Sequence, residues 1–276
     1  MSATALSDAP RTGQPGSSTS RRELVVAWQH PDERTIYPIG LLRHEDGEYS
    51  FRYIRAVRDV PGFRALLGFR DLTEVYTSSQ LFPLFAQRAM DPRRPDYVRY
   101  VTDLGLEPDE ATPWEQITRS TGRRSGDTLQ LFPVPEVVGG HVSCSFLVHG
   151  IRHIPDNHVV LDGAEHDMSA EQVDAVLTHL EPGARLDLVP EPTNRRNREA
   201  IVVVAHGFPV GYVPNLLVHD LHRLRAISQV HASVVRINGP DAPSHLRVLA
   251  QLEAAEAEGF EFFQDERWLP LTDSDR

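Results

Sequence analysis

The first hydrophobic runs of the chain follow the spacing of β-strands. Residues 24–28 are apolar without interruption, which predicts a strand that is buried in the core. A second apolar run covers residues 37–42. After the turn at residues 45–47 (Glu-Asp-Gly), aromatic and polar side chains alternate over residues 49–53. This pattern predicts a hairpin whose aromatic face is turned inward.

Further along, the apolar residues take helical spacing. We expect one helix over residues 79–90 and a second over residues 97–104, with prolines between them. A third helix is predicted to begin at Pro113, because Thr112 is a good N-cap and proline suits the first helical position. Residues 128–133 then return to the pattern of a strand.

Residues 133–140, with the sequence PVPEVVGG, mark a domain boundary, because proline and glycine gather there between two predicted strands. Beyond it, Ser169 and Gln172 form a capping box that opens another helix. The remaining expected elements are strands over residues 145–149, 186–189, 200–204, 230–237 and 246–252, and a helix over residues 216–227.

Composition limits the protein to a few classes. Its 276 residues suffice for two ordinary domains, and 40% hydrophobic with 24% charged residues is typical of a soluble globular protein. No apolar run approaches the ~18 residues of a membrane helix, so we expect no membrane partner. Cys144 is the only cysteine, which excludes an intramolecular disulfide and a cysteine zinc site and fits a reducing cytoplasm.

The charge of the chain is acidic and unevenly distributed. The net charge is −11, and all 28 basic residues are arginine. This balance argues against nonspecific coating of duplex DNA, which depends on many basic side chains that release counterions. Residues 253–276 hold eight acids and two arginines, a net charge of −6, so residues 1–252 carry only −5. A small basic groove is compatible with the low net charge of residues 1–252.

Motifs for catalysis are missing from the sequence. It has no GxSxG elbow, no DFG or HRD motif, and no phosphate-binding loop that needs lysine, so we expect no enzyme and no cofactor. The histidine pairs 219/222 and 149/153 lack a further ligand at metal-site spacing, and we predict no metal. Asp187 and Glu191 flank one strand, which leaves a metal-dependent nuclease as a third alternative.

Polar side chains gather where a groove of the second half would need them. Arg152 and His153 leave one strand, and residues 194–198 (Asn-Arg-Arg-Asn-Arg) form a turn before another. A guanidinium offers five donors in a fixed fork, and asparagine both donates and accepts, so the mixture suits phosphate and base recognition. The same residues also occur on ordinary exposed turns, and that interpretation stays open here.

Four spaced motifs in this half resemble the HIRAN domain: Gly150-Ile151-Arg152-His153, residues 186–192, Asn194 with Ala200-Ile201, and residues 210–214 (Val-Gly-Tyr-Val-Pro). The resemblance covers roughly residues 142–238. It implies a compact β-barrel with helices. Members that are fused to SWI/SNF-type remodelling and repair ATPases bind single-stranded DNA at a free 3′ end. The resemblance therefore implies DNA binding for this chain.

Within the resemblance, Arg152 and Asn194 match the family pattern, and five positions depart from it, of which Arg196, Asn197 and His153 bear on the ligand. The family's binding turn runs Asn-Pro-Tyr-Asp-x-Asn-Ala. Arg196 stands where an aromatic ring would stack on a terminal base, and Asn197 stands where a carboxylate would accept from a 3′ hydroxyl. His153 replaces a second aromatic residue. Our hypothesis is that Arg152, Arg195, Arg196 and Arg198 contact phosphates or stack, that Asn194 and Asn197 hydrogen-bond sugar or base, and that His153 lies at the mouth.

Residues 23–133 resemble the N-terminal lobe of HipA-type kinases, without the kinase core that would follow it. We therefore expect an α+β protein with a disordered leader (1–21), a HipA N-terminal-lobe-like domain (22–135), a HIRAN-like β-barrel domain (141–252) and an acidic tail (253–276). The expected function is non-enzymatic binding of single-stranded or damaged DNA. The alternative is a protein-interaction or regulatory module that has lost DNA binding and docks a protein partner through its N-terminal lobe.

Overall fold

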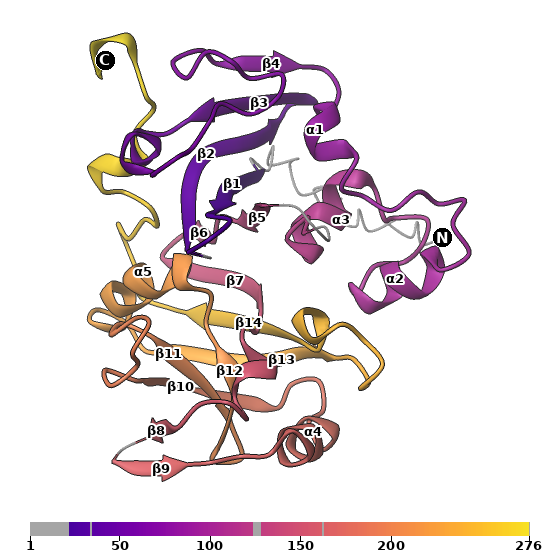
Figure 1. Ribbon diagram of the computed structural model, residues 1–276, viewed down its shortest axis with the longest axis vertical. Helices are drawn as coiled ribbons and strands as arrows, with labels where there is room; N and C mark the ends of the chain where they lie inside the picture. The colour runs from indigo at the N-terminus through magenta and orange to yellow at the C-terminus, as the bar shows by residue number, and fades with distance from the viewer. Residues whose placement is uncertain (1–21, 34, 124–127, 162, 276) are drawn as a thin grey trace, which may run out of the picture.

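The computed structural model describes residues 22–33, 35–123, 128–161 and 163–275, and the predicted leader lies outside these residues. The described chain is built around two antiparallel sheets, each with helices against it (Figure 1). Its N-terminal part forms the upper half of Figure 1, and the second sheet with its helices forms the lower half. The predicted α+β class is confirmed.

The N-terminal sheet has the strand order β4-β3-β2-β1-β5. Its strands are β1 (Arg22–Gln29), β2 (Ile36–Glu45), β3 (Glu48–Tyr53), β4 (Tyr76–Ser78) and β5 (Leu129–Pro133). The predicted hairpin is confirmed, since β2 and β3 pair from Gly40↔Tyr53 to Glu45↔Glu48. Asp46 and Gly47 in its turn both have positive φ, 52° and 80°, as a tight two-residue hairpin turn requires.

Strand β1 is buried on both of its faces, which explains its unbroken apolar sequence. Leu24 and Val26 face a core that is rich in aromatic residues. Val25 and Ala27 face the opposite way, because successive side chains of a strand alternate. There they pack in a second cluster with Trp268 from the C-terminal end of the chain.

Three helices follow β4: α1 (Pro83–Ala86), α2 (Tyr97–Asp103) and α3 (Pro113–Ser120). Helix α3 begins as predicted, with the Thr112 hydroxyl accepting a hydrogen bond from the backbone N–H of Glu115 at 3.2 Å. Helix α1 is much shorter than the predicted 79–90. Pro83 holds Phe82 in an extended conformation (φ −54°, ψ 139°), so the helix cannot start earlier.

The second sheet contains seven strands in the order β12-β11-β10-β13-β14-β7-β6. They are β6 (Glu136–Val138), β7 (His141–Leu147), β10 (Arg185–Pro190), β11 (Ile201–Ala205), β12 (Phe208–Tyr212), β13 (Val230–Ile237) and β14 (Val248–Ala254). A small hairpin, β8 (Val159–Leu161) with β9 (Ala164–His166), and the helices α4 (Ala170–Thr178) and α5 (Asn215–Arg225) complete this part. The predicted capping box at the start of α4 is confirmed.

This sheet curls almost into a barrel but closes only at one point. A single bridge joins His149, just after β7, to Tyr212 at the end of β12. Two hydrogen bonds form it, His149 N–H to the Tyr212 carbonyl at 2.9 Å and Tyr212 N–H to the His149 carbonyl at 2.8 Å. The expected β-barrel is thus an open sheet with one closing contact. Gly211, with φ 155°, lies directly at this closure.

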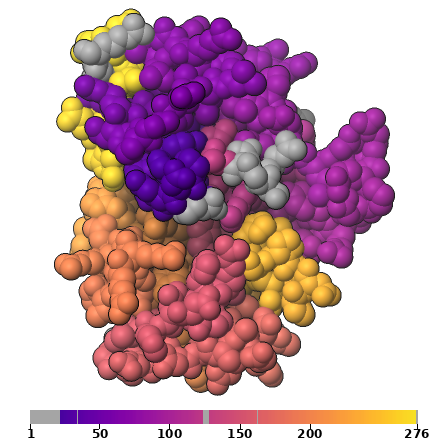
Figure 2. All heavy atoms as spheres, in the orientation of Figure 1, coloured from indigo at the N-terminus to yellow at the C-terminus, as the bar shows by residue number. Residues whose placement is uncertain are grey.

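The segment after β14, which the sequence predicts as an acidic tail, packs against both sheets. Phe260, Trp268 and Leu271 are buried in it. The backbone N–H of Leu271 donates to the Tyr53 carbonyl at 3.1 Å, and Pro270 forms a bridge with Ile54. In Figures 1 and 2 this yellow segment climbs from the lower half along one edge of the upper half. The burial of these apolar residues holds the segment in place despite its net negative charge.

Across the residues that the structure describes, no helix combines the length and the apolar character needed to cross a membrane.

Candidate functional site

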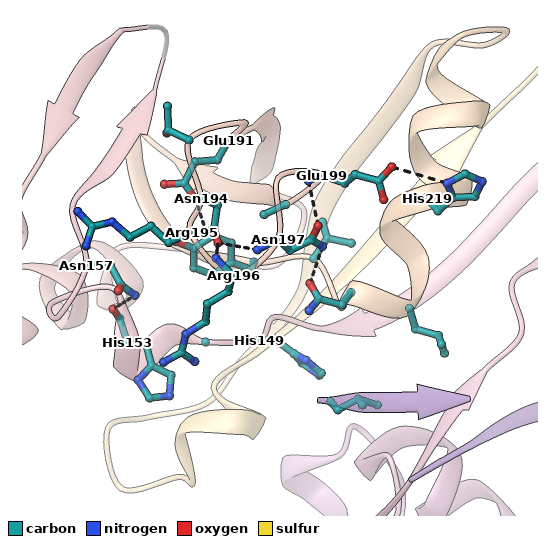
Figure 3. Close-up of a pocket in the computed structure, with 18 of the residues that line it drawn as sticks. His149, His153, Asn157, Glu191, Asn194, Arg195, Arg196, Asn197, Glu199 and His219 are labelled. Atoms are coloured by element: carbon teal, nitrogen blue, oxygen red, sulfur yellow. Dashed lines mark hydrogen bonds and ion pairs between the residues drawn. The ribbon is translucent and has the colours of Figure 1, made fainter. Parts of the chain in front are cut away.

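A cavity of 910 Å³ opens where the two sheets and the C-terminal segment meet. The loop between β10 and β11 forms one side of it, and the segment after β7 forms another (Figure 3). Strands β2 and β5 of the N-terminal sheet contribute Ile36, Pro38 and Phe132, and the C-terminal segment contributes Arg267 and Trp268. The site is therefore assembled from parts that lie far apart in the sequence.

The β10–β11 loop is held in shape by its own asparagines. The Asn194 Oδ1 atom accepts from the backbone N–H groups of Arg196 and Asn197 at 3.0 and 3.1 Å. Asn197 in turn accepts from the Glu199 N–H at 2.9 Å and donates to the Asn215 side chain at 3.2 Å. Asparagine side chains that hydrogen-bond nearby backbone groups favour such turns. Both asparagines thus have a positioning role within the loop.

The loop presents three arginines without counterions. Arg195, Arg196 and Arg198 are exposed, and within the described part of the chain their guanidinium groups make no hydrogen bond or ion pair. By contrast, Arg185 on the preceding strand pairs with Asp187, and Arg267 across the cavity pairs with Asp265. On a protein with a net charge of −11, adjacent unpaired arginines form a local binding surface for anions.

The cavity brings together five of the seven site residues that the sequence suggested: His153, Asn194, Arg195, Arg196 and Asn197. Figure 3 shows Arg195 and Arg196 reaching from the loop toward the segment that holds His153 and Asn157. Arg152 and Arg198 are not part of the lining. Arg152 is exposed and donates from Nε to the His153 ring at 3.1 Å, so it lies beside the mouth.

Two cavity residues that are not among the predicted site residues, Glu191 and Tyr212, form a buried polar network behind the loop. Glu191 is only 2% exposed, and its carboxylate accepts from Asn194 Nδ2 at 2.7 Å. Burial raises the pKa of Tyr212, and so does the adjacent Glu191 carboxylate, to which its hydroxyl is hydrogen-bonded. This network fixes Asn194 and therefore the arginines that follow it. No sequence signal marks it, because its members are twenty residues apart.

His149, which the sequence analysis considered only as one of a histidine pair, also lines the cavity, and it is uncharged at neutral pH. Burial lowers the pKa of its imidazole to about 4, and the positive charge of Arg123 and the nearby His245 act in the same direction. Its ring lies 6.0 Å from that of Phe132, centre to centre, at 52°. The residue therefore adds a neutral ring to the cavity wall instead of a cation.

The lowered pKa of His149 predicts an acid-sensitive fold. In the unfolded chain this imidazole takes up a proton near pH 6.5, whereas in the folded protein it does so only near pH 4. Its contribution to the free energy of unfolding is complete above pH 6.5 and is lost as the pH falls to about 4. We expect the urea midpoint of His149→Asn to fall less than that of the parent protein between pH 6.5 and pH 4. Parallel pH profiles for the two proteins would contradict this assignment.

In the described ranges no three histidine, cysteine, aspartate or glutamate side chains lie close enough together to hold a metal ion. The cavity's His219 lies 3.8 Å from Glu199 alone. The lining offers hydrogen-bond donors, arginines and apolar surface, together with the carboxylates of Asp156, Glu191, Glu199 and Asp265.

Comparison with solved structures gives two similar chains. A protein from Lactobacillus plantarum is 18% identical with a TM-score of 0.29, over 42% of this chain and 99% of that one. The HIRAN domain of human HLTF is 16% identical with a TM-score of 0.27, over 46% of this chain and 98% of that one. Comparison with curated proteins gives no match.

The likeness of residues 22–135 to the N-terminal lobe of HipA-type kinases stays a prediction. For the second half, the sequence pattern of the HIRAN domain family matches residues 142–255, which include β7 to β14 and the whole β10–β11 loop. Residues 142–255 of this protein are a HIRAN domain.

Proposed function

We propose that the protein binds nucleic acid at this cavity, without chemistry of its own, and that a single strand or a strand end of DNA is the preferred ligand. The observation that supports this most directly is the row of unpaired arginines, Arg195, Arg196 and Arg198, on a loop that its own hydrogen bonds hold rigid. Guanidinium groups without a protein counterion can contact phosphates without first breaking an ion pair. The HIRAN domain match agrees with a nucleic-acid-binding module.

A single-stranded ligand suits the site better than a duplex. The cavity is a local hollow between two sheets, and the surrounding protein is acidic. A duplex would bring many phosphates against that acidic body, whereas a single strand or an end places a few nucleotides inside. Arg195 and Arg196 line the cavity, while Arg152 and Arg198 lie outside the lining, where the strand would continue.

The binding test uses a fluorescent single-stranded oligonucleotide of about 15 nucleotides, a length within typical single-strand site sizes. We expect salt-dependent anisotropy and about tenfold weaker binding by Arg196→Ala, because one charge-assisted contact is lost. The double variant Arg195→Ala/Arg196→Ala should lower the slope of log K against log salt by about 1.4, at roughly 0.7 counterions per contact.

Arg225→Ala is the matched control, since it makes the same change in charge at an exposed residue. Arg225 ends α5, whereas Asn215 at the start of that helix lines the cavity. The two positions are about 15 Å apart along the helix axis. Equal losses in Arg225→Ala and Arg196→Ala would show that binding follows overall charge and would remove the site assignment.

A further inference from the structure

The cavity has two chemically different sides. Its polar side carries the arginine loop and His153, all within the HIRAN domain. Part of its apolar surface comes from the HIRAN domain itself, through Val160, Ala200, Val213 and Leu216, and the rest comes from outside that domain, through Ile36 and Pro38 on β2, Phe132 on β5 and Trp268 in the C-terminal segment. Figure 3 shows an indigo strand of the N-terminal sheet bordering the cavity beside His149.

The sequence of β2 explains how this apolar side is presented. Ile36 and Pro38 are two residues apart, so both side chains project from the same face of the strand. Both are half-buried and so keep part of their surface open. A proline inside a sheet is tolerated at a bulge, and the β1–β2 pairing shifts register between Val26 and Ala27, opposite Pro38.

Phe132 and His149 extend the same side with rings. Phe132 is nearly buried and lies against the imidazole of His149, which is neutral at physiological pH. The apolar side therefore carries no cation of its own apart from Arg267, whose charge is neutralised by Asp265 at 2.9 Å. An all-polar ligand such as free phosphate would leave this surface unused.

We infer that the apolar side is a platform for a nucleobase, so that the N-terminal sheet and the C-terminal segment are part of the nucleic-acid site. This inference rests on the proposed function. A nucleotide has the same two-sided chemistry as the cavity, with an anionic phosphate for the arginine loop and a flat, weakly polar base for the opposite wall. Bases that stack on aromatic rings strengthen single-strand binding by roughly fivefold or more and do so for any sequence. In this arrangement the site recognises the base of a nucleotide as well as its negative charge.

The experiment compares two single-stranded oligonucleotides of equal length and charge, one intact and one made of abasic residues. We expect the parent protein to bind the intact strand about tenfold more tightly, within the range for one stacked base. The double variant Ile36→Ala/Pro38→Ala should bind the abasic strand like the parent and should lower the intact-to-abasic ratio to about twofold. Leu269→Ala, an exposed apolar residue outside the lining, is the control and should keep the parent ratio.

The outcomes separate this inference from the proposed function. Absence of binding to either strand would overturn both. Equal binding of intact and abasic strands by the parent protein would overturn the base platform alone and leave phosphate binding intact. An unchanged ratio in the double variant would also overturn it. A urea midpoint for each variant verifies folding, and the single variant Ile36→Ala, with about half the effect on the binding energy, replaces the double variant if that one is unfolded.

Discussion

Gly211→Ala will cost roughly 3 kcal/mol of stability or more, the sum of backbone strain and a steric overlap. Gly211 has φ 155°, a conformation that residues with a side chain rarely adopt. A methyl group there would overlap the Val148 side chain and would lie 2.7 Å from the carbonyl oxygen of His149. These are the residues through which the second sheet closes on itself, so the closing bridge must widen to admit the methyl group.

Urea unfolding of the parent and of Gly211→Ala measures this cost directly. Gly239→Ala is the control, because a methyl group there meets no atom within 4 Å, and we expect a change of less than about 0.5 kcal/mol. The closure includes Tyr212, which lines the cavity, so oligonucleotide binding should weaken together with stability. Equal urea midpoints for the two alanine variants would contradict this prediction, because they would mean that the bridge between His149 and Tyr212 widens without cost.

Trp268→Ala will destabilise the protein by about 3–5 kcal/mol, as truncation of a buried aromatic residue does. Trp268 is 6% exposed and belongs to the apolar cluster on the outer face of β1 and β2. Its ring centre lies 4.3 Å from that of Phe263, so its loss leaves a void between the N-terminal sheet and the C-terminal segment. Because this residue also lines the cavity, the variant removes part of the cavity wall.

The adjacent Leu269 provides the matched control for this variant. It is also large and apolar, but it is 46% exposed, and Leu269→Ala should cost less than about 0.5 kcal/mol. Denaturation curves, together with limited proteolysis of the C-terminal segment, check both expectations. Similar small effects of both substitutions would mean that backbone hydrogen bonds to β3, such as that of Leu271, suffice to hold the segment.

Signals that act over a few residues made most of the secondary structure predictable. The Thr112 cap, the Ser169 capping box and the Asp46-Gly47 turn each depend on atoms within three or four residues, and the structure has all of them. Strands β7, β10, β11, β13 and β14 of the second half were predictable for the same reason, whereas β6, β8, β9 and β12 were not predicted. The helix predicted over residues 79–90 was wrong in length, because the effect of Pro83 on the preceding residue outweighed the spacing of apolar residues.

The site was predictable only in part, because its construction depends on contacts between distant segments. The Asn194 to Arg198 turn could be identified from its own residues, as could His153. The contributions of Ile36, Trp268 and the buried Glu191 could not, since their roles follow from how the two sheets and the chain end pack. The acidic composition of residues 253–276 concealed the buried aromatic residues that fix this segment.

The chain passes between the two sheets twice, through β5 to β6 on the way out and through residues 255–270 on the way back. Two halves that are joined by a single linker can rotate apart about that linker. The returning segment is attached to both halves. Pro270 forms a bridge with Ile54, and the Phe263 N–H donates to the Asp220 carboxylate on α5 at 2.9 Å. Both contacts must break before the halves separate at this edge. We therefore expect ligand exchange rates to depend on the rigidity of the arginine loop, which lines the cavity, instead of on a hinge between the halves.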